Sequence, residues 1–408
     1  MTLKALALIA AIGLHMPTLA GALDARPEAK LNPGSVTTGK SFVVYDAGTD
    51  AGSACAPYLD SPILPLSFPT ANHQDFEVWT SVVSPFNNGT NYWLKGRMSP
   101  AGAETSPFHV ACGPILPSAH QAESTQYSGS EWLIGLFKQS EGSIYGIVHN
   151  EYYGGDYPKG FDFSIPASPR CNLGAAPGKK VNPLNCTYTT LLMAVMGKGE
   201  SSFKHIADAP KHVIARPSFD YVPDAGRVTG YFTNTNIVKN SDGYYYVMTV
   251  DMLPNASQRH CPIRTSDLSN PSMWKGWNGT EYSAEISKGA DCAEIGVSFF
   301  PFYLGYSSYF EKFIMVGGHG GHISYEISSD MIHWSEPVSF GIPLFDPQTG
   351  DWSANNYPSL MDPAELQHTQ DANASSGSVV GQRPWLVFVQ HKNPRGTRIL
   401  GVPVTFSK

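Results

Sequence analysis

A repeated unit of short strands constrains what this 408-residue chain can fold into. Its clearest copy runs from Gly230 to Trp277. The apolar segment Thr235 to Val238 is followed by the turn Asn240-Ser-Asp-Gly243 and by Tyr244-Tyr-Tyr-Val-Met-Thr-Val250. Strands rich in β-branched and aromatic residues on both sides of Asp-Gly predict a hairpin. Two more apolar segments before Trp277 predict a sheet of four antiparallel strands, which is the unit of a β-propeller blade.

The same pattern recurs along the chain. A Ser-Asp turn ahead of a tryptophan occurs twice, as Arg264-Thr-Ser-Asp267 before Trp274 and as Ile327-Ser-Ser-Asp330 before Trp334. Five units of roughly 50 to 70 residues follow one another, near the period of repeat folds. An extra strand, Ser41 to Tyr45, precedes them and is expected to complete the last blade. We therefore predict an all-β fold, a single five-bladed propeller over residues 40–408 with four antiparallel strands per blade.

The N-terminus predicts secretion. Lys4 is followed by the apolar run Ala5 to Leu14 and by small residues up to Gly21, which is the pattern of a signal peptide over residues 1–21. A mobile lead-in rich in Pro, Gly and Ala is expected over residues 22–39. No later segment contains roughly 18 uninterrupted apolar residues, the length that a membrane span needs. A secreted, extracellular protein is therefore expected.

Cysteine usage agrees with an oxidising compartment. All six cysteines follow the predicted signal peptide, and an even count favours disulfides over metal ligation. Pairing by proximity in the sequence gives Cys55 with Cys112, Cys171 with Cys186 and Cys261 with Cys292. Five Asn-x-Ser/Thr sequons predict surface loops and a glycoprotein; they begin at Asn88, Asn185, Asn255, Asn278 and Asn373.

Composition narrows the classes of partner. Apolar residues make up 42% of the chain, aromatic residues 12% and charged residues 15%, which is enough for a large core. The formal net charge of -7 includes no basic run, so nucleic acid and membrane surfaces are not expected as partners. A neutral or weakly charged ligand is expected instead, bound by a monomer.

The pattern of apolar strand, Asp-Gly, tyrosine-rich strand, Ser-Asp turn and Trp resembles the five-bladed propeller glycosidases, the group of arabinanases, β-xylosidases, invertases and levansucrases. Those enzymes have acidic motifs at three blades, and this chain has Asp60-Ser-Pro62, Asn236-Ile237 and Glu294-Ile-Gly296 at the comparable places. The resemblance implies a propeller that hydrolyses glycosidic bonds, with Asp60 as its base. Glu294 is the candidate acid because an apolar strand follows it and would raise its pKa by desolvation.

Strand direction predicts which other side chains share a rim with Asp60. The start of the innermost strand and the end of its antiparallel neighbour lie at the same end of a blade. Glu151 is the strongest candidate, because the polar run His149-Asn150-Glu151-Tyr152 directly follows Ile147-Val148 and is costly to bury without partners. Catalytic carboxylates are therefore predicted at Asp60, Glu151 and Glu294. Substrate-binding residues are predicted at His149, Asn150, Tyr152, Asn236, Asp251, His319, Tyr357 and His391.

Three functions remain open from the sequence. The first is a secreted glycoside hydrolase acting on plant or microbial glycans, since hydrolysis needs one carboxylic acid and one carboxylate. The second is a polysaccharide lyase with a His or Tyr base and an arginine such as Arg97 to neutralise a uronate. The third is a sugar-binding propeller without catalysis. No metal site is expected, because Gly317-Gly-His319-Gly-Gly-His322 offers only two imidazoles, and no loop motif supports a structural calcium ion or another cofactor.

Overall fold

The computed structural model describes residues 31–50, 54–56, 59–70, 75–84, 89–99, 101–102, 104–121, 123–153, 186–222, 225–344, 355–365, 377–391 and 396–408. The predicted signal peptide, residues 1–21, lies outside them. The fold is all-β: its helical elements in these ranges are short 3-10 turns at Ser124–Gln126, Pro271–Met273 and Ile286–Lys288. The prediction of an all-β chain is therefore confirmed.

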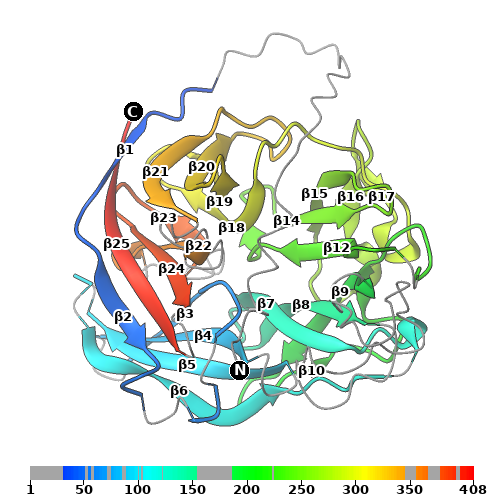
Figure 1. Ribbon diagram of the computed structural model, residues 1–408, viewed down its shortest axis with the longest axis horizontal. Coiled ribbons are helices and arrows are strands. Elements are labelled where there is room, and N and C mark those ends of the chain that lie inside the picture. The colour runs from blue at the N-terminus through cyan, green and yellow to red at the C-terminus, as the bar shows by residue number, and fades with distance from the viewer. Residues whose placement is uncertain are drawn as a thin grey trace, which may run out of the picture.

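The strands form four sheets that lie around a common centre (Figure 1). One sheet has four strands: β3 (Leu66–Pro69), β4 (Phe76–Ser84), β5 (Thr90–Met98) and β6 (Glu104–Leu116). A second has five: β18 (Phe300–Ser307), β19 (Lys312–His319), β20 (His322–Ser328), β21 (Val338–Pro343) and β23 (Val379–Val380). A third also has five: β22 (Asn356–Met361), β24 (Trp385–His391), β25 (Thr397–Ser407), β1 (Ser35–Thr38) and β2 (Phe42–Asp46).

The fourth sheet has eleven strands and departs from the expected pattern. Its first section holds β7 (Ser130–Lys138), β8 (Ile144–Tyr152), β9 (Tyr188–Met196), β10 (Lys204–His205) and β11 (Val213–Ala215). Its second section holds β12 (Thr229–Asn234), β13 (Val238–Lys239), β14 (Tyr245–Met252), β15 (Gln258–Thr265), β16 (Lys275–Trp277) and β17 (Tyr282–Ala284).

Pairing within the sheets corrects the prediction of four antiparallel strands per unit. β12 runs parallel to β9 and joins the two sections into one sheet, and β23 runs parallel to β18. Both parallel ladders pair only two residues on each strand. The alternation of apolar residues in the sequence predicts where strands form. It does not predict short parallel pairings such as these, because they depend on where a segment far away in sequence rejoins the sheet.

The first two described strands meet the last strand of the chain in the third sheet. β2 pairs with β25 along Phe42 to Asp46, which confirms the closing role expected for the strand at Ser41 to Tyr45. β1 pairs with the end of β25, from Val404 to Ser407. The predicted mobile lead-in over residues 22–39 is therefore wrong for Ser35–Thr38, because the exposed edge of β25 supplies a partner for their backbone groups.

The innermost strands are β3, β7, β12, β18 and β22 (Figure 1). Buried polar side chains join neighbouring sheets at this level. The Leu133 N–H donates to Asn91 Oδ1 at 2.8 Å, the Leu304 N–H donates to Asn236 Oδ1 at 2.9 Å, and Ser359 Oγ donates to the Ile63 carbonyl at 2.7 Å. These bonds fix the inner strands relative to one another, and with them the side chains at the strand ends.

Candidate active site

Asp60 lies just ahead of β3 and receives a hydrogen bond from the far end of the chain. Tyr357 Oη donates to Asp60 Oδ1 at 2.6 Å, across 297 residues of sequence. The Asp60 backbone N–H donates to the Val83 carbonyl at 3.0 Å, which fixes the residue at the end of β4. Asp60 is only 7% exposed. The tyrosine therefore orients a carboxyl group that is largely removed from water.

Glu151 lies near the end of β8 and accepts two side-chain hydrogen bonds. Tyr153 Oη donates to Oε2, and His149 Nε2 lies 2.9 Å from Oε1. The backbone N–H of Thr233 on β12 donates to His149 Nδ1 at 3.1 Å. Because Nδ1 accepts, the ring proton is on Nε2 and is donated to Glu151, so the imidazole is neutral. Two donors thus hold a 6% exposed carboxylate in one orientation.

Thr233 and Tyr357 share an unusual backbone conformation. Their φ angles are 55° and 53°, in the left-handed region that a β-branched or bulky residue rarely adopts. Each lies at an irregularity in the ladder of an innermost strand, between Phe232 and Asn234 in β12 and between Asn356 and Ser359 in β22. Such backbone strain is concentrated at functional sites. Here Tyr357 binds Asp60 directly, and Thr233 binds His149, which in turn binds Glu151.

The electrostatic environment of Asp60 distinguishes it from an ordinary aspartate. Burial raises its pKa from the ordinary value of 3.8 to about 6. The hydrogen bond from Tyr357 opposes this rise, and the negative charge of Glu151 adds to it. The charge of Glu151 thus disfavours the ionised form of Asp60. An acid with a pKa near 6 beside a second, hydrogen-bonded carboxylate can exchange protons near neutral pH.

Aromatic rings connect Glu151 to Asp60 along the inner strands. Consecutive ring centroids lie between 5.3 and 6.2 Å apart. The rings belong, in order, to Trp132, His149, Phe232, Phe300, Phe302 and Tyr357. We call this set the aromatic arc. Its phenylalanines are half-buried, so part of each ring is available to a ligand.

The structure does not bring Glu294 to Asp60 and Glu151. Glu294 binds His260 on β15, the third strand outward, accepting from the backbone N–H at 2.7 Å and lying 3.1 Å from Nδ1. Its side chain is 46% exposed. The expectation that it follows directly into a strand fails, because β18 begins only at Phe300 and residues 294–299 cross between sheets. Glu294 therefore lacks the burial expected of a general acid.

Among the predicted substrate-binding residues, two asparagines have structural partners. Asn150 accepts from the Gly129 N–H at 2.6 Å and donates to Thr190 Oγ1 at 3.0 Å. Asn236 joins β18 to its neighbour through the Leu304 N–H. Both are buried. Their amides hold protein groups.

Three further predicted residues lie at other places. Asp251 accepts from Arg259 at 2.6 Å, and burial raises its pKa. Tyr152 is buried against Tyr221, with ring centroids 4.9 Å apart. His319 is exposed at the end of β19, with Nδ1 3.1 Å from the Ser298 carbonyl. Each of the three therefore has a partner of its own within the described residues.

His391 ends β24 opposite Thr397, whose Oγ1 accepts from the Leu59 N–H at 3.0 Å. His391 therefore lies close to Asp60. Arg97, the arginine of the lyase hypothesis, pairs with Glu77 at the beginning of β4. Asp60 binds the other end of that strand, roughly 20 Å away at the rise of a β-strand.

Sequence reasoning did not identify Tyr153 as a donor, Thr233, or the phenylalanines of the aromatic arc. Phe300-Pro-Phe302 carries a signal, since it opens an apolar strand with two aromatic residues. Thr233 carries none, because its role comes from a backbone N–H and a positive φ.

The predicted disulfides Cys55–Cys112 and Cys261–Cys292 are present. Cys186 is also disulfide-bonded, whereas Cys171 lies outside the described residues. Within the described ranges, no group of three or more His, Cys, Asp or Glu side chains is arranged to hold a metal ion. Those ranges also contain no helix long and apolar enough to cross a membrane.

No family model and no curated protein matches this chain. It is similar to a solved structure of a protein of unknown function from Dyadobacter fermentans, with 9% identity over 92% of this chain and 100% of that one and a TM-score of 0.47. It is also similar to an endo-1,5-alpha-L-arabinanase from Thermotoga petrophila, with 12% identity over 85% and 71% and a TM-score of 0.45. A fructan 1-exohydrolase IIa from Cichorium intybus matches at 11% identity over 83% and 54%, with a TM-score of 0.42.

Proposed function

We propose that this protein is a secreted glycoside hydrolase that cleaves a neutral plant or microbial glycan between Asp60 and Glu151. The observation that carries the proposal is the pair itself: two buried carboxyl groups, each oriented by a tyrosine, with different environments. Glycosidic hydrolysis requires one protonated and one ionised carboxyl group on either side of the bond. Asp60, whose pKa burial raises, supplies the protonated group, and the second role is assigned to Glu151.

In this proposal Asp60 is the general acid and Glu151 the base or nucleophile. The raised pKa of Asp60 keeps a proton available near pH 6. That proton goes to the oxygen of the leaving sugar as the glycosidic bond breaks. Glu151, held as an acceptor by His149 and Tyr153, either takes a proton from the attacking water or attacks the anomeric carbon itself. The assignment reverses the role that the family resemblance implied for Asp60.

The aromatic arc supports a neutral sugar as ligand. Sugar rings present apolar C–H faces that pack on aromatic side chains, and the phenylalanines of the arc lie along the path between the two carboxyl groups. In the described part of the chain, the side-chain hydrogen bonds of the two carboxyl groups go to tyrosine and histidine rather than to lysine or arginine. A uronate or another acidic sugar would require such a cation, which favours hydrolysis of a neutral glycan over elimination.

Three finer features belong to the same proposal. The eleven-stranded sheet counts as two blades, divided at the parallel pairing of β9 with β12, which gives five blades with five innermost strands. Secretion is supported by the disulfides at Cys55–Cys112 and Cys261–Cys292. The protein acts as a monomer, which size-exclusion chromatography with light scattering tests.

The purified protein should be screened against neutral polysaccharides and aryl glycosides, with product sugars measured. Asp60→Asn and Glu151→Gln should each remove hydrolysis, whereas Glu294→Gln, at an exposed carboxylate outside the pair, is the matched control and should retain it. A product absorbing in the ultraviolet would identify a lyase. Sugar binding without turnover in the wild type would identify a binding protein. Either result, or full activity in both carboxyl variants, would contradict the proposal.

A further inference from the structure

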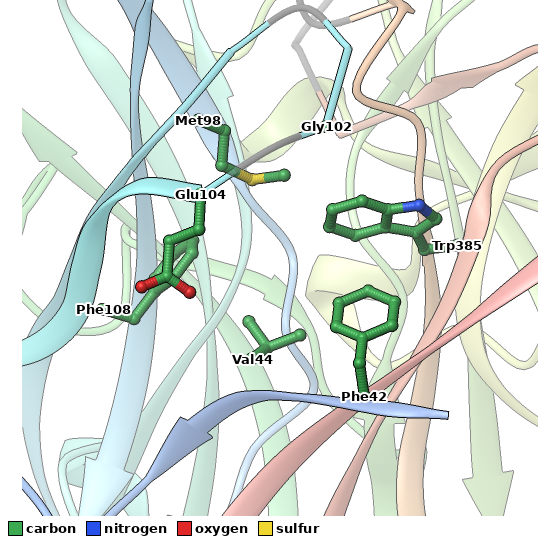
Figure 2. Close-up of a pocket in the computed structure, with 7 residues that line it drawn as sticks. All are labelled: Phe42, Val44, Met98, Gly102, Glu104, Phe108 and Trp385. Carbon is green, nitrogen blue, oxygen red and sulfur yellow. The ribbon is translucent and has the colours of Figure 1, made fainter. Parts of the chain in front are cut away.

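A pocket lies at the other end of the sheets from Asp60. It has a volume of about 260 Å³ and is lined by Phe42, Val44, Met98, Gly102, Glu104, Phe108 and Trp385 (Figure 2). These residues come from β2, β5, β6, β24 and the turn between β5 and β6. Met98 pairs with Phe76 at the beginning of β4, whereas Asp60 binds Val83 near its end. The pocket is therefore separate from the carboxyl pair.

Three aromatic rings of the pocket are held in place by glycines. A methyl group on Gly401 would lie 2.5 Å from the Phe42 ring, one on Gly96 would lie 2.7 Å from the Phe108 ring, and one on Gly102 would lie 2.7 Å from the Trp385 indole. Each ring thus packs directly on backbone that has no side chain. The rings of Phe42 and Trp385 also meet edge to face, with centroids 4.7 Å apart. The aromatic walls are rigid before any ligand binds.

Glu104 supplies the only charge among the lining residues. Figure 2 shows the rings of Phe42 and Trp385 on one side and the Glu104 carboxylate on the other. Glu104 is exposed, and no ion pair or hydrogen bond of its side chain is found among the residues that the structure describes. The pocket therefore combines preorganised aromatic faces with one carboxylate that no described lysine or arginine neutralises.

We propose that this pocket binds a small organic ammonium ion, such as a quaternary or alkylated amine. Aromatic faces attract cations through their quadrupoles, and the tryptophan indole is the strongest of them. The carboxylate adds direct charge complementarity, and the net charge of -7 favours cations further. A bare metal ion does not fit, because the lining offers one carboxylate among apolar groups. Pockets for drug-sized ligands have volumes of roughly 300 Å³ or more. The volume of this pocket is smaller, so its ligand is a small cation.

The test compares choline with dimethylbutanol, in which a carbon atom replaces the nitrogen at nearly the same shape. Each is titrated into the full-length protein by isothermal calorimetry at constant ionic strength. Choline should bind at least about tenfold more tightly than dimethylbutanol, which is the ratio expected for one cation held by aromatic faces and a carboxylate. Equal affinities, or no binding of choline, would overturn the proposal.

Two variants locate the site. Glu104→Gln removes the charge at an exposed position, so folding is unaffected; it should weaken choline about fivefold or more and leave dimethylbutanol unchanged. Trp385→Leu should weaken the binding of both ligands, and its melting temperature reports whether the fold is retained.

The matched control is Glu141→Gln, at another exposed glutamate in the turn between β7 and β8. This variant should bind choline as the wild type does. Unchanged choline affinity in Glu104→Gln and in a folded Trp385→Leu would place the cation elsewhere and overturn the proposal. Hydrolysis should be unchanged in Glu104→Gln, so this proposal and the proposed function fail independently.

Discussion

Replacing Asp60 by asparagine should stabilise the protein at high pH and leave its stability unchanged at low pH. Asp60 is 7% exposed, and burial raises its pKa from 3.8 to about 6. Each unit between the folded and unfolded pKa values corresponds to about 1.4 kcal/mol. The ionised form of Asp60 therefore costs the folded protein about 3 kcal/mol relative to the unfolded chain.

The sign follows from which state holds the proton. Below pH 3.8 the carboxyl group is protonated in both states, and its ionisation costs nothing. Between 3.8 and about 6 the unfolded chain loses this proton first, so the stability of the wild type falls as pH rises. In the D60N variant the group is neutral at every pH, and its amide oxygen still accepts from Tyr357. The variant should therefore gain stability over this window, up to about 3 kcal/mol at pH values above it.

The measurement is denaturant unfolding of both proteins followed by tryptophan fluorescence, at pH values from about 4 to 8. Other buried titrating groups are present in both proteins, so their contributions cancel in the difference between the two free energies of unfolding. A difference that rises with pH supports a buried, high-pKa carboxyl group at position 60. A difference that is flat, or that falls with pH, would refute the reasoning and remove the basis for Asp60 as the acid.

Four other outcomes are expected. Glu151→Gln should lower kcat by about 10²- to 10⁴-fold in a reducing-sugar assay; near-normal turnover would exclude Glu151 as base or nucleophile. Tyr357→Phe removes the hydrogen bond that lowers the pKa of Asp60, so the basic limb of the kcat/KM profile should move to higher pH, and an unmoved limb would contradict the acid role. Glu294→Gln should keep kcat within about twofold of the wild type, because this exposed carboxylate binds His260; a large loss of kcat would place it in the site. Glu326→Gln should raise the melting temperature above about pH 7 and not below 4.5, because burial raises the pKa of Glu326 to about 7; equal melting temperatures across this range would be inconsistent with a buried acid there.

Several strands could be predicted closely because their signal is local. Tyr244 to Val250 corresponds to β14 at Tyr245–Met252, and the apolar run from Lys312 to Gly317 lies within β19 at Lys312–His319. Alternating or continuous apolar residues between turn signals specify a strand whatever its neighbours are. The pairing between strands was less predictable, since the parallel contacts of β9 with β12 and of β18 with β23 join segments far apart in sequence.

The sequence predicted those parts of the candidate site whose environment is set by residues adjacent in the chain. The polar run ending in Glu151 and Tyr152 predicted a buried carboxylate, and Asp60 was expected at the same rim. The acid predicted at Glu294 binds His260 on β15, because residues 294–299 form no strand and β18 begins only at Phe300. An apolar segment indicates burial of its own side chains and does not specify which neighbouring polar residue is desolvated.

The sequence by itself determined the all-β class, the closing strand at Ser41 to Tyr45 and the presence of carboxylates at strand ends, because period and turn chemistry are properties of short segments. Only the tertiary structure decided that Tyr357 would donate to Asp60 and that Thr233 would hold His149 against Glu151. Those contacts depend on ladder irregularities and on the closure of the sheets around one centre. Both are set by long-range packing, which no local pattern of residues encodes.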